Sequence, residues 1–444
     1  MTLPVPISNA LTRLTKKGFE AYVVGGCVRD ALMDVEPSDF DVATNATPDE
    51  VKKVFYDYSV IDTGLEHGTV TVLSGTYPIE ITTYRVDGEY LDHRRPSNVT
   101  FTSSIKEDLS RRDFTINAMA YSPETGIFDP FDGQTDLREK RIRCVGDPAK
   151  RFAEDALRIL RALRFASALG FEIEQETKDA LMSAKDTVLE VAMERITAEF
   201  SKIVCGRHIG EVMQEYASVL AVIIPEILPT IRFQQKNPYH SYDVYIHIVK
   251  VVANVPSSLP LRLAALFHDI AKPQTYTQDE KGIGHFYGHQ KKSAEVAQEI
   301  LDRMRFDNET KKRVVDLVYH HDIQIQSEPK AVKRALNRFS EDFFINLIAL
   351  KKADVMGQNP DMRERIDTLD NLLRIYREII REDECFSLRN LEIDGKDLLA
   401  MGIPKGKRIG TVLNDCLDQV ISERIPNNRE DLVQYVMERY KDKE

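Results

Sequence analysis

Residues 21–43, AYVVGGCVRDALMDVEPSDFDVA, carry the pattern from which the rest of the chain can be interpreted. The apolar run before the glycines predicts a short buried strand, and Gly25-Gly26 predicts a turn at which backbone N–H groups can approach a ligand closely. Residues 28–33 begin a helix, whose N-terminus favours phosphate, and Arg29 would lie beside that phosphate. This stretch therefore predicts a phosphate-binding turn between a strand and a helix.

Two aspartates, Asp39 and Asp41, close the same stretch. Because side chains alternate along a strand, we expect both carboxylates on one face of a second strand and Phe40 on the other, in the core. Proteins commonly hold Mg²⁺ with one or two carboxylates plus substrate phosphates. The pair therefore predicts a magnesium site, although a short DxD pattern alone usually marks solvated residues.

The glycine pair, the helix and the DxD pattern, in this order, resemble nucleotidyltransferases of the polymerase-β type. VVGGCVRDAL and SDFDVAT in particular resemble the class II tRNA nucleotidyltransferases (CCA-adding enzymes) and the bacterial poly(A) polymerases. The resemblance covers nearly the whole chain, most strongly residues 21–43, 108–118 and 151–165. It implies a small α/β head that binds ATP and CTP, and it implies Arg112 as a triphosphate contact.

Residues 69–73 and 79–84 alternate apolar and polar side chains around a Ser-Gly turn, which predicts an antiparallel hairpin with one buried face. Glu80 lies on the second of these strands. In the family named above, a carboxylate on this strand joins the aspartate pair. The resemblance thus implies Glu80 as a third catalytic acid, and a solvated strand residue is the alternative.

The segment 147–170 predicts one helix, and its residues EDALR resemble the nucleotide-selecting motif of the family. Cytosine and adenine both present an amino donor beside a ring-nitrogen acceptor. Asp155 can accept from the amino group while Arg158 donates to the ring nitrogen, and a wrong base would bury unpaired groups at roughly 1–3 kcal/mol each. The resemblance also implies that Arg161 and Arg164 face the nucleotide, whereas spacing alone equally fits a solvated helix face.

Residues 85–96 are charged and aromatic without a clean period, which predicts a mobile loop. A single pocket that adds two cytidines and then an adenosine needs a mobile element to change its preference. In the family, enzymes that add only CC lack this loop, so its presence implies the capacity to add the terminal A. The loop residues that could exchange ion pairs with the pocket include Arg85, Asp87, Asp92, Arg94 and Arg95.

Histidines gather in the middle of the chain, where six of the ten lie between positions 247 and 321. Imidazole and carboxylate ligands without thiolates suit Mn²⁺, Fe, Ni²⁺ or Zn²⁺ in a site that is not structural zinc. The order of His247, His268-Asp269 and Asp354 resembles the HD phosphohydrolase superfamily and implies these four as metal ligands. The alternative is a degenerate HD fold whose histidines only fill the core.

Composition sets further limits. No run approaches the ~18 apolar residues that span a bilayer and we see no secretion signal, so we expect a cytoplasmic protein without a membrane partner. The five scattered cysteines include no CxxC, which argues against a zinc knuckle or a disulfide framework. A net charge of −11 requires that any RNA be held by local basic patches, such as the lysines and arginine at 396–408.

At roughly 150 residues per domain, the 444 residues suggest about three modules. We expect an α+β protein in which a polymerase-β-type head precedes an elongated, all-helical remainder. The expected parts are a nucleotidyltransferase head at 1–145, a helical neck with nucleotide-selecting and RNA-binding helices at 146–230, an HD domain at 231–365 and a tRNA-contacting helical region at 366–444.

The sequence thus predicts Mg²⁺-dependent, template-independent addition of CMP and AMP to the 3′ end of the tRNA acceptor arm. A poly(A) polymerase and an enzyme that adds only the terminal A are the nearest alternatives. A metal-dependent HD phosphohydrolase with a nucleotide-binding head is an alternative of another class. A non-catalytic RNA-binding protein is a third, but it would have no use for a metal-binding face with two carboxylates.

Overall fold

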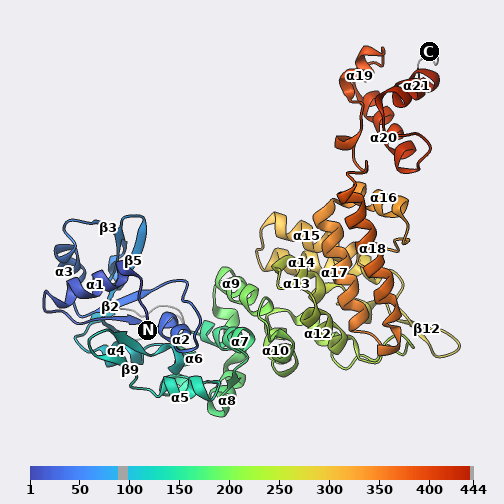
Figure 1. Ribbon diagram of the computed structural model, residues 1–444. Coiled ribbons are helices and arrows are strands. Elements are labelled where there is room, and N and C mark those ends of the chain that lie inside the picture. The colour runs from blue at the N-terminus through green and yellow to red at the C-terminus, as the bar shows by residue number, and fades with distance from the viewer. Residues whose placement is uncertain (89–98, 441–444) are drawn as a thin grey trace. The chain divides into compact units, whose positions relative to one another are not determined.

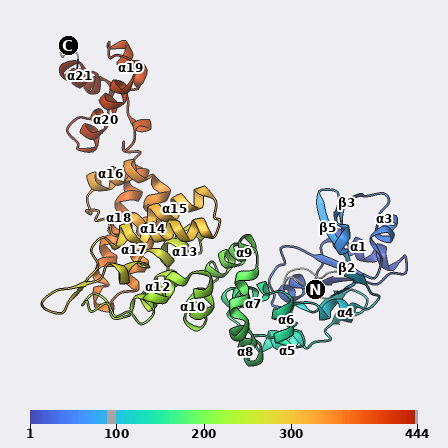
Figure 2. The ribbon, with the colours of Figure 1, turned by 180° about the vertical axis from the view of Figure 1, so that it is seen from behind.

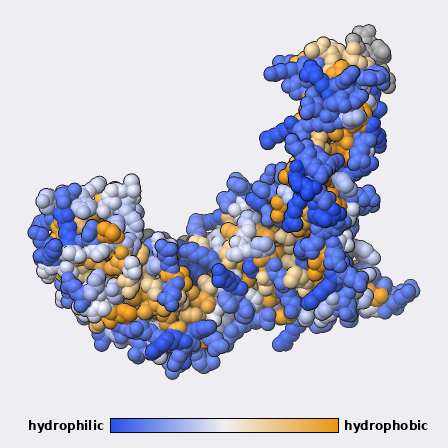
Figure 3. All heavy atoms as spheres, viewed as in Figure 1, coloured by the Kyte–Doolittle hydropathy of each residue, from blue (hydrophilic) through white to orange (hydrophobic). Residues whose placement is uncertain are grey.

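The computed structural model describes residues 1–88 and 99–440 of the chain. It comprises two compact units, Met1–Pro225 and Glu226–Glu444, which are drawn from two sides in Figures 1 and 2 and are described separately below. On the face drawn in Figure 3, hydrophilic residues are interspersed with hydrophobic ones. Within the described ranges, none of the helices combines the length and the apolar character needed to cross a membrane.

A seven-stranded sheet forms the head of the first unit, with the strand order β3-β4-β5-β2-β1-β8-β9. The β2–β5 pair is parallel, and the other neighbouring strands pair antiparallel. The expected hairpin of β4 and β5 is confirmed. The strands are β1 (Ala21–Val24), β2 (Asp41–Thr44), β3 (Ser59–Gly64), β4 (Thr69–Ser74), β5 (Tyr77–Thr83), β8 (Ala120–Ser122) and β9 (Gly126–Phe128).

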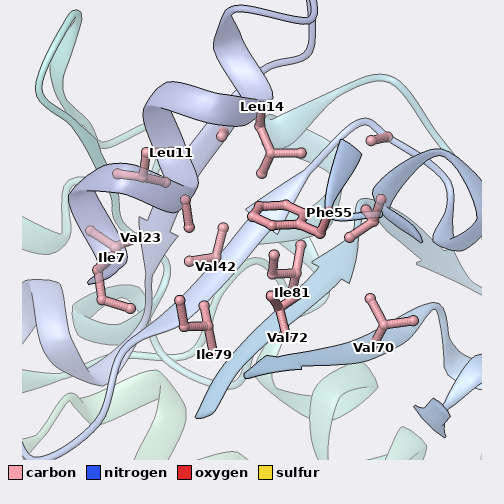
Figure 4. Close-up of a cluster of buried hydrophobic side chains, with 14 of the residues drawn as sticks. Ile7, Leu11, Leu14, Val23, Val42, Phe55, Val70, Val72, Ile79 and Ile81 are labelled. Atoms are coloured by element: carbon pink, nitrogen blue, oxygen red, sulfur yellow. The ribbon is translucent and has the colours of Figure 1, made fainter. Parts of the chain in front are cut away.

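One face of this sheet carries the core of the head (Figure 4). Ile7, Leu11 and Leu14 of α1 (Val5–Thr15) point toward apolar side chains of the central strands. Phe55 follows α3 (Pro48–Val54) and is also buried there. The expected helix start at Thr47 is confirmed, because Thr47 and Glu50 form a capping box that satisfies backbone N–H groups at the helix N-terminus. Two helices thus fix the strands that carry the expected acids.

The remaining elements of the first unit are mostly short helices. They are α2 (Gly26–Leu32), α4 (Ile105–Ser110), α5 (Gly133–Arg138), α6 (Pro148–Glu154), α7 (Leu157–Leu169), α8 (Gln175–Ala184), α9 (Met193–Val204), α10 (Ile209–Glu215) and α11 (Ala217–Ile223). Short strand pairs are β6 (Arg85–Asp87) with β7 (Val99–Phe101), and β10 (Arg141–Ile142) with β11 (Glu172–Ile173).

The second unit is helical apart from one two-residue strand pair, β12 (Thr277–Gln278) with β13 (Gly284–His285), among its described residues. The mixed α+β class is therefore confirmed, although β11–β13 show that the part after the head is not purely helical. Its helices are α12 (Val244–Asn254), α13 (Leu259–Phe267), α14 (His289–Arg303), α15 (Asn308–His320), α16 (Pro329–Phe339), α17 (Glu341–Met356), α18 (Glu364–Arg381), α19 (Gly395–Ala400), α20 (Lys407–Ile421) and α21 (Arg429–Tyr440).

Helix α18 packs with α16 and α17 around a shared apolar cluster that includes Leu336, Phe344 and Leu372. A separate cluster, which includes Leu398, Leu417 and Leu432, joins the last three helices. One apolar cluster therefore ends with α18, and the second cluster begins after it. The division of the chain into four parts stays a prediction.

Candidate active site

The two aspartates of the DxD pattern lie at the start of β2. The strand begins at Asp41, so the prediction that Asp39 also belongs to it is wrong. The expected alternation still holds, because both aspartates are exposed whereas Phe40 packs against the core cluster. Glu80 is the register partner of Asp41 in the parallel β2–β5 pair, so the three carboxylates come from adjacent segments of one sheet.

The electrostatic environment of Asp41 disfavours its ionised form. Neighbouring protein atoms displace part of the water around the Asp41 carboxyl, and this desolvation raises its pKa. The positive charge of Arg112 lowers the pKa, whereas the negative charges of Asp39 and Glu80 raise it further. A divalent cation relieves such repulsion because its charge is opposite to theirs. These hard oxygen donors fit Mg²⁺.

The predicted glycine turn holds an arginine at close range. Gly25 adopts a φ of +83°, which L side chains rarely adopt, and a Cβ there would lie 2.6 Å from Nη1 of Arg112. Nε of Arg112 is buried and has no hydrogen-bond partner among the described residues. A guanidinium nitrogen with unused donor capacity beside such a turn suits an anionic ligand.

A cavity of about 540 Å³ is lined by residues of the helices α2, α7 and α9 and of the segments beside the sheet in the same unit. Glu80 lies outside its lining. The lining includes the predicted metal ligands Asp39 and Asp41. It also includes most of the predicted nucleotide-binding positions, namely Gly26, Arg29, Arg112, Asp155, Arg158, Arg161 and Arg164, together with Cys27, Arg111, Asp113, Asn117, Leu157, Phe165 and Arg195.

Arg29 is fixed at one wall of this cavity. Its Nη1 donates to Oδ1 of Asn117 at 2.7 Å, and its guanidinium pairs with Asp30 at 2.7 Å. The Cζ atoms of Arg29 and Arg164 lie 5.2 and 4.4 Å from the ring centroid of Phe165, within the range of cation–π attraction. The Cζ atom of Arg161 lies 5.7 Å from the same centroid, so the ring contacts three guanidinium groups at the cavity wall.

The helix expected over 147–170 is interrupted, so that prediction is wrong. Asp155 adopts extended backbone angles, φ −144° and ψ 103°, between α6 and α7. Its Oδ1 accepts a hydrogen bond from the backbone N–H of Leu157 at 3.1 Å, and its carbonyl accepts one from the N–H of Arg158 at 3.0 Å. An aspartate can satisfy backbone N–H groups at the start of a helix, so α7 begins anew after it.

Asp155 and Arg158 both line the cavity, and each is held by other residues. Nη2 of Arg195 lies 2.9 Å from Oδ2 of Asp155 in an ion pair. Arg158 donates from Nη1 to Oε2 of Glu154 at 2.7 Å and from Nη2 to the carbonyl of Arg111 at 3.0 Å. Both side chains are thereby fixed at the cavity before any nucleotide binds.

The other two arginines of α7 also form ion pairs at the cavity. Arg161 contacts Asp113 at 2.5 Å, and Arg164 contacts Glu199 at 3.0 Å. Burial raises the pKa of Asp113, but the ion pair with Arg161 outweighs it and the net shift is downward.

Several residues at this site were not predicted from the sequence, including Asp113, Asn117, Arg195 and Glu199. Arg195 and Glu199 lie one turn apart on α9. In the sequence, only their opposite charges at i, i+4 in an amphipathic helix could have indicated that they belong to the site.

The expected mobile loop is only partly described. Arg85 and Asp87 lie on β6, which pairs antiparallel with β7. The backbone N–H of Arg85 donates to Oδ1 of Asp108 at 3.3 Å, so this end of the segment is tied to α4. Asp92, Arg94 and Arg95 lie outside the described residues.

In the second unit, the four predicted metal ligands come together. The ligand atoms of His247, His268, Asp269 and Asp354 all lie within 4.8 Å of one another. Nε2 of His247 lies 3.2 Å from Oδ2 of Asp269 and 3.1 Å from Oδ1 of Asp354. Burial lowers the pKa of His247, but its hydrogen bonds with the two carboxylates outweigh this and raise the pKa to about 9.

Three helices position these ligands. His247 lies on α12, His268 caps the C-terminus of α13 with Asp269 next in the chain, and Asp354 lies in the last turn of α17. The adjacent cavity measures about 280 Å³ and is lined by Asp269 and Asp354 among others.

Two further histidines, His289 and His321, form a second group with Asp269, and their ligand atoms also lie within 4.8 Å of one another. They were not among the ligands predicted from the sequence. Spacing alone could not separate them from their neighbours His285, which pairs with Asp279 at 2.9 Å, and His320, which packs against an aromatic ring.

Family comparisons cover most of the chain. Residues 21–143 match the family described as "Poly A polymerase head domain", residues 170–229 match the "Probable RNA and SrmB- binding site of polymerase A", and residues 275–436 match domain 2 of tRNA nucleotidyltransferases. Membership of a nucleotidyltransferase family implies dependence on a divalent metal ion in general.

Similar proteins agree with these matches. The CCA-adding enzyme of Oceanobacillus iheyensis is 34% identical over 434 residues, which cover 97% of this chain and 96% of that protein. The CCA-adding enzyme of Staphylococcus haemolyticus is 33% identical over 97% of each chain. Among solved structures, the CCA-adding enzyme of Bacillus stearothermophilus in complex with CTP aligns with a TM-score of 0.71 and 26% identity, over 99% of this chain and 98% of that chain. The chain therefore belongs to the CCA-adding enzyme family of tRNA nucleotidyltransferases.

Proposed function

We propose that the cavity of the first unit is the site at which CMP and AMP, from CTP and ATP, are joined to the 3′ end of tRNA. The observation that carries this proposal is the lining of that single cavity. It brings Asp39 and Asp41, which suit a metal ion, together with Asp155 and Arg158, which suit a base, and with a group of further arginines. A phosphate-bearing nucleotide needs all three kinds of contact at once.

Asp39 and Asp41 would hold Mg²⁺, and Glu80 stands beside them in register with Asp41. When bound, Mg²⁺ supplies activation of the tRNA 3′-hydroxyl and neutralisation of the triphosphate charge. In the reaction the 3′-oxygen bonds to the α-phosphorus and the bond to the leaving pyrophosphate breaks. Arg112, beside the glycine turn, would bind the triphosphate and align it for this exchange.

The side chains of Asp155 and Arg158 would replace a nucleic-acid template. A carboxylate offers about four lone-pair sites, so Asp155 can accept from a base amino group while Arg195 holds its Oδ2. Arg158 would donate to the ring nitrogen that cytosine and adenine share. Uracil and guanine present an N–H at that position, which would face a donor.

The ligand named for one similar structure supports this assignment. CTP is bound in the solved Bacillus stearothermophilus structure, and the Thermotoga maritima CCA-adding enzyme is complexed with tRNA. The latter is 21% identical to this chain, so it supports the fold alone. We propose that the chain acts in the cytoplasm, which is consistent with a tRNA-modifying enzyme.

The segment 85–96 would change the nucleotide preference of this site from CTP to ATP after two cytidines have been added.

Incorporation assays with the full chain test the assignment. Asp39→Ala or Asp41→Ala should abolish incorporation of labelled CMP and AMP, while the chain still folds and binds tRNA as the unsubstituted chain does, since both side chains are exposed. Asp57→Ala is a matched surface control that should transfer normally. Normal transfer by either Asp39 or Asp41 variant would remove the cavity as the catalytic site.

A second function is favoured by the histidine and aspartate cluster of the second unit. We propose that His247, His268, Asp269 and Asp354 hold a transition metal, from Mn, Fe, Ni or Zn, for hydrolysis of a phosphate ester. The fit rests on the donors themselves: two imidazoles and two carboxylates place their ligand atoms within 4.8 Å of one another, a donor set that suits these metals. Metal analysis of the purified chain tests this assignment, and a metal-free protein without phosphatase or 2′,3′-cyclic phosphodiesterase activity would make the cluster a structural core.

A further inference from the structure

A cavity of about 510 Å³ in the second unit takes no part in either proposed activity. Its walls are α15 and the corner at which α16 meets α17, three helices that are labelled in Figure 1. It shares no lining residue with the head cavity or with the cavity beside the histidine and aspartate cluster. Sites for small molecules commonly have volumes in this range, so the cavity is a candidate for a ligand of its own.

Three rings line this cavity and contact one another. Phe339 and Phe343 are stacked, with their ring centroids 5.1 Å apart and their planes inclined by 22°. His320 lies edge-on to Phe339, with the ring centroids 4.8 Å apart. All three side chains are only half-buried, so part of their surface is open to a ligand. A flat aromatic ligand gains attraction by stacking on such rings.

The backbone is strained at the corner between α16 and α17. Ser340, which also lines the cavity, adopts φ +67° and ψ 160°. This combination is essentially confined to glycine, and another residue keeps it only where the surrounding structure holds it there. Residues strained in this way gather at ligand-binding sites. The strain therefore supports a binding role for the corner, which a simple connection between two helices would not require.

The cavity also carries charges of both signs. Its lining contains three cations and three carboxylates, namely Lys312, Arg313 and Arg338, and Glu309, Asp316 and Asp342. Within residues 1–88 and 99–440, none of these six side chains forms an ion pair. The Cζ atom of Arg338 instead lies 4.7 Å from the ring centroid of Phe339, which places a positive charge at the aromatic corner. Donors and acceptors of both signs are therefore left for a ligand.

These charges favour a small ligand over a strand of RNA. A groove that follows an RNA backbone needs an excess of positive charge, whereas this lining carries as many carboxylates as cations. One phosphate group can pair with two neighbouring cations, and a carboxylate can accept a hydrogen bond from an amino group. A flat ring, an amino group and a single phosphate occur together in the nucleoside monophosphates of adenine, cytosine and guanine.

We propose that this cavity binds a free nucleoside monophosphate whose base carries an amino group. The base stacks on Phe339 and Phe343, and the phosphate pairs with Arg313 and Arg338. Asp316 accepts a hydrogen bond from the amino group of the base. The site lies outside the residues assigned to nucleotide addition and to ester hydrolysis, so the absence of binding here would leave both proposed functions standing.

The chain contains no tryptophan, so a single substitution creates a local fluorescence reporter. Phe343→Trp in the full chain places the single indole at the cavity, and titrations in EDTA remove the divalent ions that both proposed reactions need. We expect AMP to quench the fluorescence in a saturable manner, and ribose 5-phosphate, which has no base, to leave it unchanged. UMP, whose base has no amino group, should bind about fivefold more weakly, and adenosine, which has no phosphate, at least about tenfold more weakly.

In the reporter chain, Arg313→Gln should weaken AMP binding by at least about tenfold. Lys311→Gln is the matched control and should leave the affinity unchanged, because Lys311 lies on the same helix but pairs with Asp302 of α14 at 2.7 Å. An Arg313→Gln variant that binds AMP as tightly as the Lys311→Gln variant would overturn the phosphate contact.

Photolabelling of the unsubstituted chain with 8-azido-AMP, followed by peptide mass spectrometry, tests the native aromatic pair. We expect label within residues 309–343. Its absence there would overturn the proposal even if the reporter variant failed to fold. Quenching by tRNA without quenching by AMP would overturn the assignment to a free nucleotide.

Discussion

Arg195 on α9 pairs with Asp155 at 2.9 Å, and so fixes the carboxylate that we propose reads the base. The arginine reaches this position from a different helix than the predicted motif, and its Nη1 is buried without a hydrogen-bond partner in the described structure. Arg195 is a positioning residue in this account, because it acts through Asp155.

We therefore predict that Arg195→Ala relaxes base discrimination. The ratio of CTP to UTP incorporation should fall by at least about tenfold, because a hydrogen bond to a charged group contributes roughly 1.5–3 kcal/mol. Arg195→Lys should restore part of the ratio, which a merely destabilised fold would not show. Lys202→Ala, at an exposed position of the same helix, serves as control, and an unchanged ratio in Arg195→Ala would refute the positioning role.

Gly25 offers a second prediction, since a Cβ at this residue would displace Arg112. Gly25→Ala should raise the KM for CTP and ATP by about tenfold or more, as a charge-assisted contact to the triphosphate is lost. Gly18→Ala is the matched control, because Gly18 also has a positive φ, +86°, but no atom lies within 4 Å of the position that a Cβ would take there. Both changes should destabilise the fold by about 1–3 kcal/mol. Equal KM values for the two variants would contradict the role of the glycine turn.

The pH dependence of stability follows from Asp41. Because the fold raises its pKa, the free energy of unfolding without metal is highest below the unfolded pKa of Asp41 and decreases as the pH rises through the folded pKa. Asp41→Asn removes the negative charge, so the free energy of unfolding no longer decreases when this side chain would ionise. We expect the variant to melt at a higher temperature than the unsubstituted chain at pH 7 without metal, and at a similar temperature in acid.

Asp113→Asn should change the melting temperature at pH 7 in the opposite direction and serves as a control. Arg161 holds the pKa of Asp113 below its ordinary value, so this carboxylate stabilises the fold above its unfolded pKa and that stability is lost as the pH falls. Thermal melts at several pH values, without and with Mg²⁺, measure both effects. A lower melting temperature for Asp41→Asn at pH 7 without metal would show that loss of water around the carboxyl and the charges of Asp39 and Glu80 do not disfavour ionised Asp41.

The two proposed activities should be separable. His268→Gln should remove bound transition metal and any phosphatase or 2′,3′-cyclic phosphodiesterase activity, yet leave CMP and AMP addition unchanged, because the cluster and the head cavity are built from different units. Parallel assays of both activities on one protein preparation provide the measurement. Loss of nucleotide addition in a folded His268→Gln variant would contradict this independence.

The sequence predicted the local patterns well and the long-range pairings poorly. The turn at Gly25, the β4–β5 hairpin and the start of α3 depend on neighbouring residues, and the structure has all of them. The break at Asp155 was missed, because periodicity favours a continuous helix whereas one side-chain hydrogen bond ends it. The partnership of Arg195 with a residue 40 positions earlier has no local pattern at all.

The metal cluster shows the same limit. His247, His268, Asp269 and Asp354 could be named because their order in the chain has a known counterpart. His289 and His321 were visible only as members of a local excess of histidine. The packing of α14 and α15 decides which of the neighbouring histidines faces Asp269. The spacing of histidines in the sequence does not contain this information.

In the proposed function, one protein-templated cavity completes the CCA end. Three transcripts of one tRNA, ending at the discriminator base, after one C and after two C, are incubated with the full chain, Mg²⁺ and CTP, ATP or both. We expect all three to be completed to CCA when both nucleotides are present, and deletion of residues 85–96 to stall the products at CC. Asp155→Ala should admit UTP or GTP. Extension of only the transcript that ends in CC, or long adenosine tails on unrelated RNA, would contradict the account.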